Sequence, residues 1–151
     1  MSRSRLPASI RQVLAERARG RCEYCQSPEA YCPDSFTIEH IVPCQQGGTD
    51  DLNNLAWACF GCNGRKYTKM QGVDPQTQQS VALFHPRQQK WYEHFAWSED
   101  LQVLEGRSSL DRRTIAVLDL NRPSVVNLQR VLVMVGEHPV QREYLGEEGE
   151  D

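Results

Sequence analysis

The chain has 151 residues, of which 25% are charged and 39% are hydrophobic, and its net charge is −3 at pH 7. This composition is typical of a globular protein, and no stretch approaches the roughly 18 apolar residues that a membrane-spanning helix needs. The length fits one domain, or a small domain with an extension. The first residues include arginines but no apolar segment behind them, so we expect no secretory signal, a cytoplasmic location and no membrane partner.

The chain opens on a helical pattern. Ile10, Val13 and Leu14 recur at helical spacing, which predicts a helix near residues 7–19 that begins at Pro7 and stops at Gly20. Prolines and polar residues then predict a loop over residues 26–35.

A small β–β–α unit is expected next. Residues 36–42 are rich in β-branched and aromatic side chains and predict a strand that ends before Pro43. A polar loop follows over residues 45–54, and the short apolar run 55–58 suits the return strand. A helix is predicted from about Asn63 to Lys69.

One Cys-x-x-Cys pair precedes this unit, and a second lies between its return strand and its helix. In a chain without a secretory signal, four cysteines at this spacing favour a structural zinc site over disulfides. The expected zinc ligands are Cys22, Cys25, Cys59 and Cys62. Such a site would contribute much of the stability of so small a unit. We interpret the two remaining cysteines, Cys32 and Cys44, as ordinary free thiols.

The segment that the cysteines enclose resembles the HNH endonuclease family in its His-Asn-Asn form. The matching strings are Cys-Glu-Tyr-Cys at 22–25, Glu-His-Ile-Val-Pro at 39–43, Gly-Gly-Thr-Asp-Asp-Leu-Asn-Asn-Leu at 47–55 and Cys-Phe-Gly-Cys-Asn-Gly-Arg-Lys at 59–66. More loosely, the whole chain looks like small bacterial HNH proteins whose extension has a Leu-Phe-His-Pro-Arg stretch, here residues 83–87, and a Trp…His-Phe…Trp stretch, here residues 91–97. The resemblance implies a ββα-metal fold and a metal-dependent endonuclease.

The resemblance also implies a role for each motif residue. His40 would be the general base, because a neutral imidazole can take a proton from water near pH 7. Glu39 and Asn63 would offer oxygen ligands to one catalytic Mg²⁺ or Mn²⁺. Asn54, rather than Asn53, would tie the loop to the backbone near the histidine. Since neighbouring positions of a strand face opposite sides, Glu39 and His40 can share a site only where the strand ends.

Basic residues point to a nucleic-acid partner despite the negative net charge. Lys66, with Arg65 as a helper, could neutralise a substrate phosphate. A further basic group lies near the N-terminus: Arg3, Arg5, Arg11, Arg17, Arg19 and Arg21. A local basic face can bind phosphates under an acidic total, although arginines on a solvated helix need no ligand. We expect DNA as the substrate, with RNA as an alternative, and the oligomeric state stays open.

The remaining chain predicts an α+β extension. Residues 71–80 suggest a linker or an extended loop. Residues 91–97 with 101–104 suggest a hairpin, and the region from about Leu110 to Asn121 suggests a helix. A last helix is expected from Pro123 to Gly136, before an acidic tail from about 143. His85 and His94 lie outside the motif and are most simply structural, with a supporting active-site role for His85 as the alternative.

The expected organisation is thus an α+β fold of three parts. An N-terminal helix occupies residues 1–20, a ββα-metal core stapled by zinc occupies 21–70, and a hairpin-plus-helices extension packs on it over 71–151. A DNA endonuclease leaving 5′-phosphate and 3′-hydroxyl ends is the expected function. Two alternatives remain: a zinc-stapled nucleic-acid-binding module without catalysis, and a zinc protein that acts through protein contacts.

Overall fold

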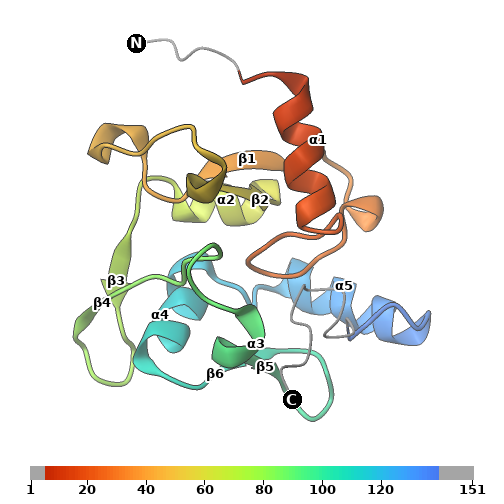
Figure 1. Ribbon diagram of the computed structural model, residues 1–151. Helices are drawn as coiled ribbons and strands as arrows, with labels where there is room; N and C mark the ends of the chain where they lie inside the picture. Colours follow the sequence, from red (N-terminus) through yellow and green to blue (C-terminus); the bar gives the residue numbers. More distant parts are fainter. Residues whose placement is uncertain (1–5, 140–151) are drawn as a thin grey trace, which may run out of the picture.

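The computed structural model describes residues 6–139. They form an α+β fold in which short helices surround three separate two-stranded antiparallel sheets, β1–β2, β3–β4 and β5–β6 (Figure 1). The predicted acidic tail lies outside the described residues. Within the described part of the chain, no helix combines the length and the apolar character that crossing a membrane requires.

The N-terminal helix α1 spans Ala8–Arg17 and packs on the first sheet. It ends there because Arg19 and Gly20 adopt positive φ angles of 54° and 70°, and the Gly20 amide bonds back to the Ala15 carbonyl. A left-handed residue followed by such a bond is a common helix ending. The predicted helix is therefore confirmed, with Gly20 in its stopping role.

The predicted β–β–α order is also present. Strand β1 (Thr37–His40) pairs antiparallel with β2 (Leu55–Ala58), so that His40 lies opposite Leu55. Helix α2 (Phe60–Lys66) follows directly and packs against β1. It begins three residues earlier than predicted, because the Cys59 sulfur accepts a hydrogen bond from the Cys62 amide and caps the helix.

The segment expected to be a linker is instead a hairpin, with β3 at Gln71–Val73 and β4 at Ser80–Ala82. The buried guanidinium of Arg113 holds it by donating to the carbonyl oxygens of Gly72 and Val81. At Gly72 a Cβ would collide with the Arg113 side chain, so this close approach needs glycine. A distant residue thus makes a sheet from a locally turn-like sequence.

The rest of the extension contains a second hairpin and three helices. Trp91–His94 forms the short helix α3, which runs into β5 (Phe95–Trp97), and β5 pairs with β6 (Leu104–Gly106). The predicted hairpin therefore exists, but its first part is helical. Helix α4 (Ser109–Leu118) starts at a capping box of Ser108 and Asp111, and α5 spans Pro123–Met134.

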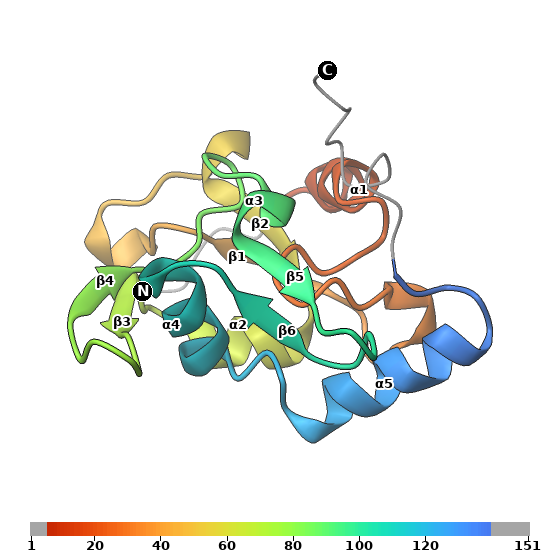
Figure 2. The same ribbon diagram turned by 90° about the horizontal axis from the view of Figure 1, so that it is seen from below.

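One continuous core joins the two parts of the chain. It contains Leu14, Tyr24 and Trp57 from the first part, with Phe84, Trp91 and Leu118 from the extension. Helix α2 packs against α4, and the view from below shows the β5–β6 hairpin and α5 beside the first part (Figure 2). The extension therefore covers one side of the cysteine-bearing unit.

Candidate functional site

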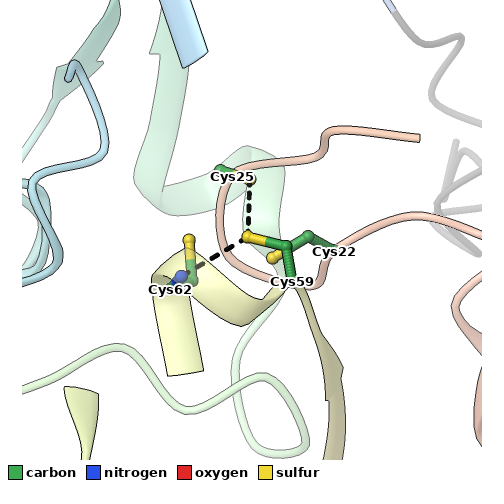
Figure 3. A group of neighbouring side chains, drawn as sticks. All are labelled: Cys22, Cys25, Cys59 and Cys62. Atoms are coloured by element: carbon green, nitrogen blue, oxygen red, sulfur yellow. Dashed lines mark hydrogen bonds between the residues drawn. The ribbon is translucent and has the colours of Figure 1, made fainter. Parts of the chain in front are cut away.

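The four cysteines of the two Cys-x-x-Cys pairs lie together in one buried cluster. Cys22 and Cys25 come from the loop after α1, whereas Cys59 and Cys62 come from the start of α2 (Figure 3). Their sulfur atoms all lie within 4.8 Å of one another, and the sulfurs of Cys25 and Cys59 are 3.8 Å apart. A tetrahedron with Zn–S bonds of about 2.3 Å has S–S edges of about 3.8 Å. None of the chain's six cysteines forms a disulfide.

The chemistry of the cluster fits zinc. Burial raises the pKa of the Cys22 thiol well above its usual value, because a thiolate there is removed from water. Four buried sulfurs can become thiolates together only if a cation compensates their charge. Zn²⁺ prefers tetrahedral sulfur ligands, and such closed sites are structural. The donor set and its burial therefore match a structural zinc site.

Arg122 adds a positive charge to this cluster. Its guanidinium donates to the sulfurs of Cys59 and Cys62, at 3.6 Å in each case. Burial lowers the pKa of Arg122, but the nearby cysteines, Cys62 first, raise it above its ordinary value, so the side chain stays charged. Zinc with four thiolates carries a net charge of about −2. The arginine at the start of α5 partly offsets this charge.

Glycine at position 61 makes room for this arginine. A Cβ there would lie 2.6 Å from an Arg122 nitrogen. Gly61 is thus part of the packing that brings the extension to the cysteine cluster.

His40 lies at the end of β1, on the wall of a cavity of about 570 Å³. Its Nε2 is 2.7 Å from the Asp50 carboxylate, and Asn63 of α2 lines the same cavity. The Asn63 side-chain amide donates to Thr37 Oγ1 at 2.9 Å. The structure therefore brings two of the motif residues, His40 and Asn63, to one concave surface.

Asn54 holds the loop beside this cavity. Its Oδ1 accepts from the Val42 amide at 2.9 Å, and its Nδ2 donates to the carbonyl oxygens of Val42 and Thr49. Asn54 is buried, whereas Asn53 is exposed. The side chain of Asn54 thereby links the segment after His40 to the segment before Asp50.

Glu39 faces the other side of β1. Its carboxylate is buried and accepts from Lys66 Nζ at 2.5 Å and from the Tyr24 hydroxyl at 2.7 Å. Burial, followed by the effect of Glu39, raises the pKa of Tyr24, so its hydroxyl remains a donor. Glu39 does not line the cavity that holds His40 and Asn63. The end of β1 does not bring the Glu-His pair into one site.

The two basic residues of α2 differ in exposure. Lys66 is 1% exposed, and its ammonium group also donates to the Ile41 carbonyl. Arg65 is exposed and bonds within its own helix, to the Gly61 carbonyl. Arg65 is therefore the more accessible of the two for a phosphate.

Several arginines of the N-terminal basic group serve the fold. Arg11 donates to the Phe36 carbonyl and lies over the Trp57 ring, and Arg17 donates to the carbonyls of Leu52 and Leu55. Arg3 and Arg5 lie outside the described residues. The basic pattern near the N-terminus is in part a set of contacts between α1 and the first sheet.

The residues outside the motif have structural contacts. His94 Nδ1 lies 2.6 Å from the buried Asp111 carboxylate, and His85 Nδ1 accepts from the amides of Arg87 and Gln88. Burial is the main cause that raises the pKa of the Cys32 thiol to about 11.

Two residues of the site were missed by the sequence analysis. Asp50 lies in a polar loop with a second aspartate beside it, and nothing in the string distinguishes the two. Arg122 lies sixty residues beyond Cys62, and only its position just before a helix-starting proline was visible.

Comparison with known proteins supports the assignment of the cysteine-bearing segment. Residues 22–69 match the family model described as HNH endonuclease. Searches of curated proteins and of solved structures gave no match. The matched segment contains all four cysteines of the cluster, together with His40, Asn54 and Asn63. Residues 22–69, about a third of the sequence, thus match the HNH endonuclease family.

Proposed function

We propose that this protein is a metal-dependent endonuclease that hydrolyses DNA phosphodiester bonds. The observation that carries the proposal is the cavity at the end of β1, where His40 and Asn63 meet inside the segment that matches the HNH family. The layout that we propose is a ββα-metal core made of β1, β2 and α2, held by structural zinc. We also propose that the chain divides at residues 20 and 70 into an N-terminal helix, this core and an extension that packs on the core.

His40 is the proposed general base. Asp50 lies within hydrogen-bond distance of Nε2 and favours the tautomer that carries the proton there. The lone pair of that neutral ring is on Nδ1, which would take a proton from water. The oxygen of that water attacks phosphorus, and the bond to the 3′ oxygen breaks. The 3′ oxygen takes a proton from solvent and His40 returns its proton to solvent, so the products are a 5′ phosphate and a 3′ hydroxyl.

A catalytic Mg²⁺ or Mn²⁺ fits the cavity only in part. Asn63 offers a carbonyl oxygen there, but the proposed carboxylate ligand, Glu39, is held by Lys66 and Tyr24. We therefore propose that metal binding by Glu39 and its ion pair with Lys66 are alternatives. A divalent ion would stabilise the negative charge on the phosphate and on the leaving oxygen.

The side chains around the cavity have separate proposed tasks. Asn54 would orient the loop, since it bonds to the backbone on both sides of the cavity. Arg65 is the first candidate for a phosphate contact, because it is exposed. Lys66 would reach a phosphate only after leaving Glu39.

A second candidate function is a nucleic-acid-binding module without catalysis. The observation that favours it is the buried ion pair itself, because it occupies the only acidic residue of the proposed catalytic set. In this alternative the zinc cluster and the Glu39–Lys66 pair would serve the fold alone.

Conversion of supercoiled plasmid to nicked or linear DNA in Mg²⁺ tests the proposal. Wild type is compared with His40→Ala, and Asn53→Ala serves as a control that changes an exposed neighbour of the site. We expect activity in wild type and in Asn53→Ala, and none in His40→Ala. Equal activity of all three would contradict the proposed base. If the wild type holds zinc and binds DNA at low salt but does not cleave it, the binding module is favoured. If it does not bind DNA either, a protein that acts through protein contacts is favoured.

A further inference from the structure

A second group of metal-ligating side chains lies on the loop beside the proposed base. A ring nitrogen of His40, the sulfur of Cys44 and a carboxylate oxygen of Asp50 all lie within 4.8 Å of one another. The three residues come from the end of β1, from the 3₁₀ helix Cys44–Gln46 and from the loop before the 3₁₀ helix Leu52–Asn54. Cys44 and Asp50 are exposed, so an ion can enter from solvent.

The backbone that carries these three residues is firmly held. The Asn54 side chain bonds to Val42, which lies between His40 and Cys44, and to Thr49, which precedes Asp50. The Gly48 amide donates to the Pro43 carbonyl at 3.0 Å. A Cβ at Gly48 would overlap the Val42 carbonyl, so the loop closes against the end of β1 in a way that only glycine permits. A site whose ligand segments are fixed in advance costs little ordering on binding.

The donor set selects the kind of metal. One imidazole nitrogen, one thiolate and one carboxylate form a mixed set that suits Zn²⁺, with a fourth position open to water. Mg²⁺ prefers oxygen ligands in octahedral geometry, and Asp50 alone offers one here. The side chains of His40, Cys44 and Asp50 therefore suit Zn²⁺ better than they suit Mg²⁺, the proposed catalytic ion.

We propose that His40, Cys44 and Asp50 form a second, solvent-accessible zinc site whose occupation switches off the nuclease. Zinc binding releases the Cys44 thiol proton to water and takes a lone pair from the His40 ring. A neutral imidazole has one lone pair, so a zinc-bound His40 cannot also accept a proton from water. The inhibitory part rests on the proposed nuclease function, whereas the binding part does not.

The binding test uses the full chain with its four-cysteine site already filled, titrated with Zn²⁺ against a chromophoric chelator. Wild type is compared with Cys44→Ser and with the matched control Cys32→Ser, which changes a half-buried thiol outside the group. We expect a second zinc in wild type and Cys32→Ser and its loss in Cys44→Ser. One zinc in wild type, or two in Cys44→Ser, would overturn the proposal. Co²⁺ at the second site should also show thiolate-to-cobalt absorption that disappears in Cys44→Ser.

The activity test measures plasmid nicking in Mg²⁺ with increasing Zn²⁺. We expect zinc to inhibit wild type and Cys32→Ser, and Cys44→Ser to resist inhibition. Equal inhibition of Cys44→Ser would overturn the switch. If wild type showed no nicking at all, the proposed function would fail, and the zinc titration would still decide whether the second site exists.

Discussion

The guanidinium of Arg122 lies 3.6 Å from the sulfur of Cys62, so a residue of the extension contacts the four-cysteine cluster of the segment that matches the HNH family. The same group contacts Cys59 and the carbonyl oxygens of Leu118 and Asp119. The charge of the cluster is therefore offset from outside the segment that matches the family. If the cluster holds zinc, as its sulfur ligands favour, its retention would depend on Arg122 of the extension as well as on the four cysteines.

Replacing Arg122 by methionine should weaken zinc retention. The change keeps most of the side-chain volume but removes the charge and the donors to sulfur. Losing such an outer contact typically reduces metal affinity about 10- to 100-fold. Transfer of zinc to a chromophoric chelator measures the effect, with Arg130→Met as the control because Arg130 is an exposed residue of the same helix α5. Equal zinc transfer from both variants would contradict the proposed role.

Two glycines of helix α2 should respond in opposite directions to alanine. Gly64→Ala meets open space and should stabilise the protein by roughly 0.5–1 kcal/mol, because glycine is a poor helix residue. Gly61→Ala would press on Arg122 and should lower both the free energy of unfolding and zinc retention. Urea denaturation with zinc present compares them, and a stabilising Gly61→Ala would show that Arg122 moves aside freely.

The Glu39–Lys66 pair should be costly to break on one side only. Both side chains are almost fully buried, so either Glu39→Gln or Lys66→Met alone should destabilise the fold by about 3–5 kcal/mol. The double variant should lose clearly less than the sum, because no unpaired charge remains. Urea denaturation of the four proteins gives the coupling energy, and additive losses would mean that the pair is not coupled.

Asn54→Ala should strongly reduce the proposed nuclease activity and should lower the free energy of unfolding only moderately. The variant loses three hydrogen bonds that hold the loop beside His40, and a small displacement of a catalytic group can cost about 10²-fold in rate. The unsatisfied Val42 amide should cost about 1–3 kcal/mol. Plasmid nicking and thermal denaturation are measured beside Asn53→Ala, and equal nicking rates in the two variants would argue against a positioning role.

Local signals in the sequence were sufficient for helices α1, α2, α4 and α5, for β1–β2 and for the cysteine cluster, but not for the short helix α3. Gly20 ends a helix, Pro123 begins one, and the Cys-x-x-Cys spacing favours a metal site. Each of these effects depends on a few neighbouring residues and is visible in a short stretch of sequence. The hairpin at β3–β4 could not be found in this way, since Arg113 holds it from a helix far along the chain. Local composition there favours turns, and tertiary contacts decide otherwise.

At the candidate site, too, some features could be predicted from nearby residues, whereas others depend on the tertiary fold. The spacing favoured Asn54 over Asn53 as the residue that ties the loop, which stays a prediction, and the Asn54 side chain does bond to the backbone of Val42 and Thr49. The burial of Lys66 was not visible, because a lysine at the end of a helix is usually exposed. Asp50 was missed because two adjacent aspartates in a loop look alike until the fold places one of them beside His40.

The indole nitrogen of Trp91 donates to the Tyr24 carbonyl at 3.0 Å, from well beyond the end of the family match. Residues 22–69 are therefore not a portable module in this protein. A chain shortened to residues 22–69 would expose the segment between Cys22 and Cys25 to solvent. It would also leave the Tyr24 carbonyl without the Trp91 donor. A graft of residues 22–69 onto another scaffold would therefore have to include Trp91 and Arg122, or supply substitutes for both.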